Sequence, residues 1–227
     1  MCGRYTIRRA DVGAAALRAL NMPLFEEFTE LKIVPRFNIA PSQSAPVIRL
    51  NAAGKAAAGE VRWGLIPSWT KGKPKMQPIN ARAENVATSA MFRQALERRR
   101  CLVPADGFYE WHGSKPPKQP YFIRRKDDGL FMFAGLWERW KPDDDAEPID
   151  TFTLITTTPN ELMSPIHNRM PVILGPADYG KWLDRDAGAE EAMKLLRPYP
   201  AEEMEAWPIS ARVNRVGNDG PELLEKV

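Results

Sequence analysis

Short apolar runs with a period of two, bounded by glycine, proline and charged residues, recur along most of the chain. They are typical of β-strands, whose side chains alternate between a buried face and a solvent face. We expect strands at Pro46–Leu50, Glu60–Gly64, Arg100–Val103, Phe108–His112, Tyr121–Arg125, Leu130–Trp137 and Thr151–Thr157. Strands therefore outnumber helices in the predicted fold.

Two stretches instead have the apolar spacing of an amphipathic helix. Asp11 can cap a helix whose apolar positions continue to Leu20, and a second helix is predicted from about Val86 to Arg99, with arginines on its polar face. We expect both helices to pack against the strands.

The connecting segments are short. Lys71–Pro78 and Lys141–Pro148 are polar, contain proline and indicate surface loops, and neither is long enough to separate two domains. With 227 residues and 44% hydrophobic content, the chain can bury a sizeable core. We expect a single α+β domain over residues 1–227, with a curved, mainly antiparallel β-sheet core and a few flanking helices.

Composition excludes several classes of protein. The longest apolar run is too short to span a bilayer, and the N-terminus lacks the apolar core of a signal peptide. The two cysteines, Cys2 and Cys101, make neither a disulfide framework nor a zinc motif. We therefore expect a soluble, cytoplasmic monomer without a metal or cofactor and without a membrane partner. The chain has 32 Lys and Arg and 29 Asp and Glu, so its small positive net charge permits a nucleic-acid partner without arguing for one.

Cys2 directly follows the initiator methionine, and its small side chain favours removal of Met1. Removal leaves an α-amine with a pKa of roughly 8 beside a thiol with a pKa of about 8.5, so both nucleophiles are expected to be partly available near neutral pH. An aldehyde is their natural target, because the amine forms a Schiff base on which the thiol closes to a thiazolidine. The alternative is an ordinary small residue at a frayed terminus.

Eight strings decide between these alternatives. They are MCGRY from Met1, PRFNIAP at Pro35–Pro41, WGLIPSW at Trp63–Trp69, NARAE at Asn80–Glu84, CLVPADGFYEW at Cys101–Trp111, KQPYF at Lys118–Phe122, FAGLW at Phe133–Trp137 and HNRMPVIL at His167–Leu174. In this order they resemble the SRAP family, named after SOS-response-associated peptidases. The resemblance covers essentially the whole chain.

The resemblance implies a function in the DNA damage response. A protein of this family binds single-stranded DNA at a site that lacks a base, and its N-terminal cysteine becomes cross-linked to the ring-opened abasic sugar, which shields the lesion. The implied activity is DNA–protein cross-linking with lyase-like and autoproteolytic character. The implied partner is single-stranded DNA containing abasic sites, and replication-fork proteins are left open as further partners.

The resemblance also implies catalytic roles beside Cys2. Glu110 is the implied proton shuttle, His167 the implied acid that assists ring opening, and Asn80 the implied holder of the amine and the sugar. The residues alone leave plainer alternatives open. Strand alternation can point Glu110 to solvent, and Asn80 can be a turn residue.

Six further residues in or beside these strings are candidates for DNA contact. Guanidinium groups grip phosphates, and flat apolar side chains hold unstacked bases. The candidates are Arg4, Arg82 and Arg169 for phosphates and Pro41, Trp69 and Phe108 for bases. Each of the apolar three can equally belong to the core.

Other residues in these regions are read as structural. Trp63, Trp111 and Trp137 lie in strand-like runs and are expected in the core, and His112 is expected at the surface or in a structural role. Where the family pattern often has another arginine, this chain has Ala90, which predicts one weaker phosphate contact.

Two other functions remain open at this stage. A cysteine peptidase would use Cys2 as nucleophile with His167 and Glu110 as base and orienting group. A non-covalent single-strand binder would not need Cys2, and salt would weaken it steeply. An amine on the nucleophilic residue is superfluous for acyl transfer but indispensable for an aldehyde adduct, which favours cross-linking.

Overall fold

The computed structural model describes residues 2–9 and 34–227, so the helix expected from Asp11 to Leu20 lies outside the described residues. The strands are β1 (Arg4–Ile7), β2 (Arg36–Ile39), β3 (Ser44–Leu50), β4 (Ala56–Trp63), β5 (Asn80–Arg82), β6 (Arg100–Ala105), β7 (Gly107–His112), β8 (Gln119–Arg125), β9 (Phe131–Trp140), β10 (Ile149–Thr157), β11 (Met170–Pro171), β12 (Ile173–Leu174) and β13 (Met204–Pro208). The α-helices are α3 (Arg93–Arg98), α4 (Tyr179–Leu183) and α5 (Gly188–Met193).

Five of the longer strands close on themselves. β4, β3, β6 and β9 pair in this order, and β10 pairs with both β9 and β4, which completes the ring. β10 runs parallel to β4 and β5, whereas the other pairings in this sheet are antiparallel. The short strands β5 and β11 pair with β10, and β12 pairs with β9.

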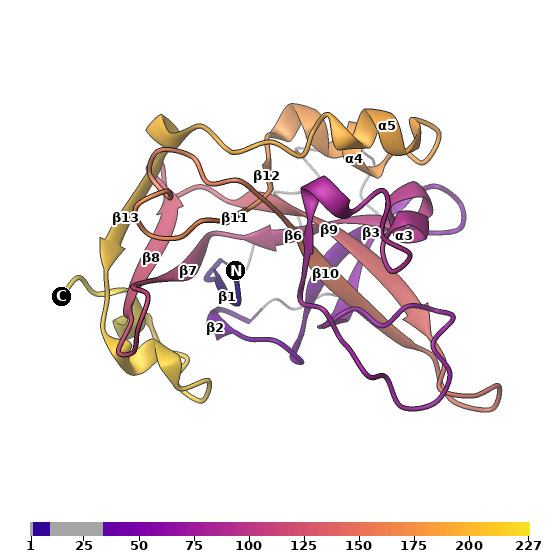
Figure 1. The fold of residues 1–227 in the computed structure, drawn as a ribbon, viewed down its shortest axis with the longest axis horizontal. Helices are drawn as coiled ribbons and strands as arrows, with labels where there is room; N and C mark the ends of the chain where they lie inside the picture. The colour runs from indigo at the N-terminus through magenta and orange to yellow at the C-terminus, as the bar shows by residue number, and fades with distance from the viewer. Residues whose placement is uncertain (1, 10–33) are drawn as a thin grey trace.

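A second sheet of five strands, in the order β13-β8-β7-β1-β2, lies beside the ring (Figure 1). All of its pairings are antiparallel, and β1 lies between β7 and β2. The N-terminal strand is thus an inner strand of a sheet. The two sheets agree with the expected curved, mainly antiparallel core.

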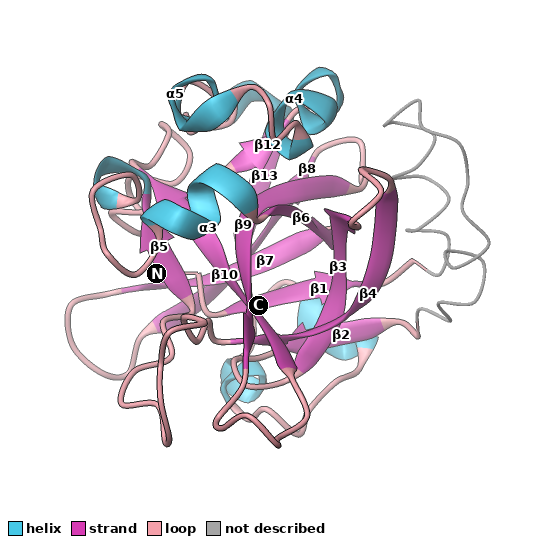
Figure 2. Ribbon diagram, turned by 90° about the vertical axis from the view of Figure 1, so that its right-hand side faces the viewer, coloured by secondary structure: helices cyan, strands magenta, loops and turns pink. Residues whose placement is uncertain are grey.

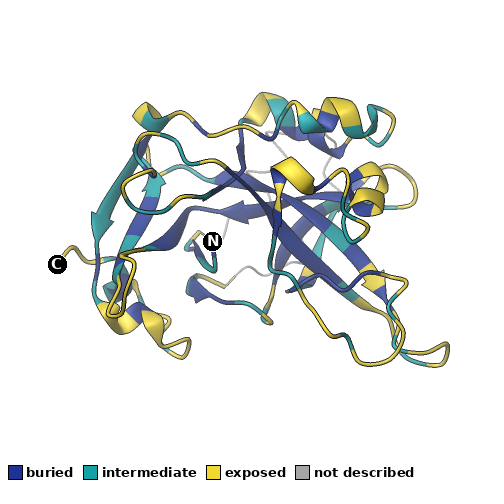
Figure 3. Ribbon diagram, viewed as in Figure 1, coloured by how far each residue is buried: buried dark blue, intermediate teal, exposed yellow. Residues whose placement is uncertain are grey.

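The α-helices α3, α4 and α5 lie on one side of the ring, as Figure 2 shows. Trp182 of α4, Ala95 and Leu96 of α3 and Ala192 of α5 pack in one apolar cluster with strand residues such as Leu136. A second cluster, which includes Tyr5, Trp63 and Phe133, joins the ring to the five-stranded sheet. The strands are correspondingly the most buried elements of the chain (Figure 3).

All seven strands expected from the sequence are present, with ends that differ by a few residues. The strands not foreseen, β1, β2, β5, β11, β12 and β13, have two to five residues and are too short to show a period. The part of the chain that the structure describes contains no helix with the length and hydropathy needed to cross a membrane.

The helix expected from Val86 to Arg99 is wrong in its first half. Only Arg93–Arg98 is helical, and residues 86–92 form turns. Thr88 Oγ1 donates to the carbonyl of Asn85, and Ser89 Oγ accepts from the amide of Met91. Such local side-chain bonds compete with helical hydrogen bonding, which the apolar spacing alone does not reveal.

A buried carboxylate fastens β1 to the corner between β6 and β7. Asp106 is fully buried, and its Oδ1 accepts hydrogen bonds from Thr6 Oγ1 at 2.6 Å and Arg8 Nε at 3.0 Å. Its Oδ2 accepts from the backbone N–H of Arg8 at 2.6 Å. Charge-assisted bonds of this kind are about twice as strong as neutral ones, so Asp106 determines where the N-terminal strand lies.

We expect Asp106→Ala to lower the free energy of unfolding by about 3 kcal/mol, because it leaves buried donors on Thr6 and Arg8 without an acceptor. Chemical denaturation measures this change. The matched control is Asp145→Ala in an exposed loop, which should change the free energy by less than about 0.5 kcal/mol. Equal stability of the two variants would contradict the anchoring role.

Candidate functional site

Cys2 lies just before β1 and is fully buried. Its thiol donates to the carbonyl of Arg4, with Sγ 3.8 Å from the oxygen. Burial raises the pKa of this thiol far above its usual range, and the negative charge of Glu110 acts in the same direction. Burial therefore opposes the partial ionisation near neutral pH that the free amino acid suggests.

Asn80 begins β5, which runs parallel to β10 with Asn80 opposite Leu154. The preceding residue is held by Trp63, whose Nε1 donates to the carbonyl of Ile79 at 2.9 Å. Asn80 Nδ2 in turn donates to the carbonyl of Cys2 at 2.9 Å. Its buried Oδ1 has no donor among the described residues, so an acceptor beside Cys2 is left for an amine or a hydroxyl group.

Glu110 lies on β7, where strand alternation puts its side chain on the same face as Phe108, toward the core between the sheets. Only 1% of the residue is exposed, so the alternative of a solvent-facing glutamate is wrong. Burial raises the pKa of Glu110 to about 7. Near neutral pH this carboxyl can therefore both donate and accept a proton.

His167 lies in the segment between β10 and β11, with its Nε2 4.0 Å from Glu110 Oε2. Its Nδ1 is 3.1 Å from the backbone nitrogen of Arg169 and 3.2 Å from the carbonyl oxygen of the same residue. The backbone N–H can donate to Nδ1 and the carbonyl can accept from it, so both contacts position the ring through Arg169 while Nε2 points toward Glu110. Partial burial lowers the pKa of His167, which favours the neutral form.

The segment that carries His167 is itself fastened. Asn160 Oδ1 accepts from the amide of Met163, and Asn160 Nδ2 donates to the carbonyl of Tyr199 at 2.7 Å. His112 Nδ1 lies 2.8 Å from the carbonyl oxygen of Pro165. His112 is thus exposed and structural, as expected, and it joins the end of β7 to the loop of His167.

The structure brings the four expected catalytic residues together from four separate parts of the chain. Asn80 touches Cys2, the charge of Glu110 acts on the Cys2 thiol, and Glu110 faces His167. Across residues 2–9 and 34–227, no three His, Cys, Asp or Glu side chains are grouped as metal ligands would be. The arrangement offers a nucleophile, an amide and two proton carriers.

The three arginines expected to contact phosphates differ in their surroundings. Arg82 is exposed, and its guanidinium makes no hydrogen bond or ion pair with the part of the chain that the structure describes. Arg169 is bound by both oxygens of Glu84, at 2.5 and 2.9 Å, and donates to the carbonyl of Thr156. These contacts fix the residue whose backbone holds His167.

Arg4 is used inside the protein. Its guanidinium donates to Asn38 Oδ1 at 2.9 Å and to the carbonyls of Val213 and Asn214 at 2.7 and 3.4 Å. These bonds join the N-terminal strand to the C-terminal 3-10 turn at Ala211–Asn214. The geometry gives Arg4 a structural role rather than a free phosphate-binding one.

The apolar candidates also separate into two kinds. Trp69 is 59% exposed, and Pro41 lies half-buried in the turn between β2 and β3, so both reach the surface. Phe108 is fully buried and packs edge-on against Phe133, so it belongs to the core and offers no face to a base. Ala90 is exposed and lines a hollow beside Trp69.

The three tryptophans that were expected to be structural differ in how far they are buried. Trp63 is fully buried, whereas Trp111 and Trp137 are half-buried. Trp111 Nε1 donates to Asn214 Oδ1 at 2.8 Å, and Trp137 lies under the guanidinium of Arg49, 4.0 Å from its ring centre. Both make structural contacts.

Two residues near the site were not singled out from the sequence. Glu84 binds Arg169, and this hydrogen bond is the main reason why the pKa of Glu84 lies below its usual range. The positive charge of Lys118 lowers the pKa of both Glu110 and His167, although burial of those groups is the larger effect. Both lie inside the matched strings NARAE and KQPYF, which was the only signal available.

The chain is similar to characterised families and structures over nearly its full length. Residues 1–216 match the family model described as SOS response associated peptidase (SRAP). The abasic site processing protein YoqW of Bacillus subtilis is 41% identical over 230 residues, which cover 99% of each chain. The abasic site processing protein HMCES of Gallus gallus is 35% identical over 99% of this chain and 77% of its own length.

Solved structures agree with these matches. The crystal structure of a Bacteroides thetaiotaomicron protein superposes with a TM-score of 0.83 and 26% identity, with complete coverage of both chains. A Bordetella bronchiseptica protein gives a TM-score of 0.73 at 28% identity, over 92% of this chain and all of its own. Family model, relatives and fold agree, and the chain belongs to the SRAP family of abasic-site processing proteins.

Proposed function

We propose that this protein traps abasic sites in single-stranded DNA by forming a covalent thiazolidine between Cys2 and the ring-opened deoxyribose. The observation that carries the proposal is the contact of Cys2 with Asn80 beside a buried carboxyl, Glu110, whose pKa is raised to about 7. A proton carrier of that pKa beside an N-terminal nucleophile suits a reaction with several proton transfers.

The chemistry proceeds in two bond-forming steps once Met1 has been removed. The α-amine of Cys2 attacks the aldehyde carbon, and water leaves as the C=N bond of the Schiff base forms. The sulfur then adds to the imine carbon, and the thiol proton ends on the nitrogen. One water is lost overall and no oxidant or reductant is required.

The raised thiol pKa orders these steps. A protonated, buried thiol is a poor first nucleophile, so the amine reacts first and the sulfur follows once a base has taken its proton. Glu110 in its ionised form is that base, and in its protonated form it supplies a proton earlier, when the sugar opens. His167 directs its Nε2 toward the same place, and the free Oδ1 of Asn80 accepts from the amine or a sugar hydroxyl.

The strand is held by the candidates that remain accessible. Arg82 offers a guanidinium without a partner in the described chain, two residues beyond Asn80 on the same strand. Arg169 offers the one Nη1 hydrogen that its bonds to Glu84 and Thr156 leave at the end of its guanidinium, and Pro41 and Trp69 supply apolar surfaces for unstacked bases. The contacts expected of Arg4 and Phe108 are not part of the proposal.

We expect the protein, mixed with single-stranded DNA that carries one abasic site, to give a slower band on a denaturing gel. Cys2→Ala should give none, because it lacks the sulfur that closes the ring, and intact DNA should give none with either protein. Mass spectrometry of the reactive protein should show that Met1 has been removed.

Two outcomes would overturn the proposal in different ways. Retention of Met1 throughout an active preparation would remove the amine from the reaction. Release of all DNA by denaturant, together with Cys2-dependent cleavage of a peptide, would instead establish the peptidase function. DNA binding that salt weakens equally in wild type and Cys2→Ala, without any covalent band, would establish a binding module.

The pH dependence of the cross-linking rate should follow the ionisation of Glu110. Glu110 is needed first in its acid form and then in its base form, so the wild-type rate should pass through a maximum near its pKa of about 7 and fall on either side, where one of the two forms is lost. Glu110→Gln should lower the rate about 100-fold and remove the maximum near pH 7. Single-turnover gels between about pH 5 and pH 9 measure both, and an unchanged profile in the variant would exclude Glu110 as the shuttle.

A further inference from the structure

A carboxylate lies among the groups expected to hold DNA. Glu84 is exposed and belongs to the 3-10 turn Ala83–Asn85, two residues after Arg82. Its two carboxylate oxygens accept hydrogen bonds from Arg169 at 2.5 and 2.9 Å. The negative charge of Glu84 thus lies beside two arginines that are candidates for phosphate contact, where it opposes the approach of a phosphate. Its presence there calls for an explanation.

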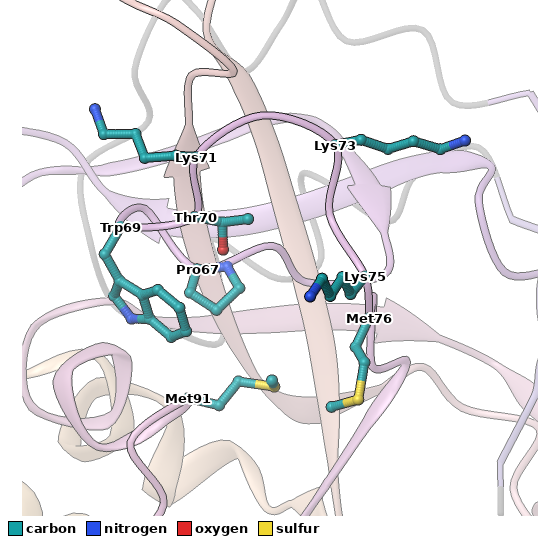
Figure 4. A pocket seen from close by; sticks show the side chains of 8 residues that line it. All are labelled: Pro67, Trp69, Thr70, Lys71, Lys73, Lys75, Met76 and Met91. Carbon is teal, nitrogen blue, oxygen red and sulfur yellow. The ribbon is translucent and has the colours of Figure 1, made fainter.

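The surface around Trp69 has the opposite character. The hollow beside this residue has no carboxylate among the described residues that line it, which include Lys71, Lys73 and Lys75 (Figure 4). Glu84, in contrast, stays ionised near neutral pH. The hydrogen bond from Arg169 lowers the pKa of Glu84, and the charge of Arg82 acts in the same direction. The protein therefore keeps a full negative charge at a place where it weakens attraction for DNA.

The ion pair of Glu84 and Arg169 connects two segments of the site across β10. Thr156 of β10 pairs with β5 on one side and with β11 on the other. Arg169 directly precedes β11, and its Nη2 donates to the carbonyl of Thr156 at 2.6 Å. Glu84 directly follows β5, the strand of Asn80. The ion pair therefore ties the strand of Asn80 to the segment that carries His167.

The backbone of Arg169 positions the ring of His167. Its nitrogen and carbonyl oxygen lie 3.1 and 3.2 Å from His167 Nδ1, while Nε2 of the ring lies 4.0 Å from Glu110 Oε2. Only 12% of the Arg169 side chain is exposed, so its charge is largely removed from water and needs a carboxylate partner. Without Glu84, the guanidinium would turn toward solvent or a phosphate, and the backbone that holds the ring would lose its support.

We propose that Glu84 is a positioning residue of the cross-linking reaction, which binds Arg169 so that the backbone of Arg169 holds His167 beside the reacting groups. The same carboxylate lowers the affinity for undamaged single strands, because it occupies the guanidinium and repels phosphates. This inference rests on the proposed function and adds a residue to it. Removal of Glu84 should therefore move the rate and the affinity in opposite directions.

The test measures these two quantities separately in Glu84→Ala. Single-turnover gels at saturating protein give the rate constant for cross-linking to single-stranded DNA with one abasic site. Fluorescence anisotropy at several salt concentrations gives the affinity for the same strand without the lesion. We expect the rate constant to fall at least about tenfold, since a misplacement of about 1 Å can lower a rate about 100-fold.

The affinity of Glu84→Ala for the undamaged strand should rise about two- to fivefold, because a negative charge near the phosphates is removed. The slope of log affinity against log salt should become steeper by up to about 0.7, as one added phosphate contact of Arg169 predicts. A variant that had merely lost its fold would instead lose affinity together with rate. Where Glu84→Ala does not fold, Glu84→Gln keeps the shape of the side chain, and the same directions of change are expected.

Two further variants are matched controls. Glu84→Asp keeps a carboxylate on a shorter side chain and should recover much of the rate. Glu190→Ala removes the same charge from an exposed position on α5 and should leave both the rate and the affinity near wild type. Equal effects of Glu84→Ala and Glu190→Ala would mean that only overall charge matters, and would overturn the inference.

A double-mutant cycle tests whether Glu84 acts through His167. The rate constant is measured for Glu84→Ala, for His167→Ala and for the double variant. The double variant should be no slower than His167→Ala, because no ring is left to be positioned. Losses that multiply in the double variant would mean that Glu84 acts independently of His167, and would contradict the positioning role.

Failure of this inference can be told from failure of the proposed function. Absence of any cross-link with the wild-type protein would overturn the proposed function. Wild-type cross-linking together with an unchanged rate constant in Glu84→Ala would overturn the positioning role alone. A loss of affinity as large as the loss of rate, in a variant with wild-type stability to chemical denaturation, would do the same.

Discussion

The buried carboxylate of Asp106 is the contact on which the rest of the site depends. It accepts from Thr6 and from the backbone and side chain of Arg8, so the first strand cannot move away from β7 without leaving buried donors unpaired. Chain termini usually fray, and a nucleophile at position two needs such an anchor. Arg4 adds a second one, through Asn38 and the C-terminal turn.

Burial then determines the chemistry of what the anchored strand carries. The same desolvation that raises the pKa of Glu110 into the neutral range raises that of the Cys2 thiol beyond it. The same buried environment thus makes Glu110 a proton carrier near neutral pH and keeps the Cys2 thiol protonated. Because the thiolate is the form that oxidises, this also protects Cys2 from adventitious oxidation. His167 stays neutral beside them, oriented by the backbone of Arg169, whose side chain Glu84 holds.

Much of the fold was predictable from local pattern, and the failures have local causes. Long strands such as β9 and β10 can be predicted from their length and from the alternation of apolar and polar residues. Strands of two to five residues are too short to show that alternation and form by pairing with a neighbouring strand. The helix predicted before α3 does not form, because the side chains of Thr88 and Ser89 make hydrogen bonds with the backbone of Asn85 and Met91. Of the site, the residue types were predictable through family strings. The hydrogen bonds that occupy the guanidinium of Arg4 and the burial of Phe108 could not be predicted from those strings.

The sequence by itself determined the inventory: an N-terminal cysteine, the family to which its motifs belong, and the residue types able to move protons and grip a strand. Only the tertiary structure decided which of these residues meet, since Cys2, Asn80, Glu110 and His167 come from distant segments. It also shifted the pKa values of Cys2, Glu110 and His167, because pKa depends on the solvent that the surrounding sheets exclude, and no single residue or motif carries that information.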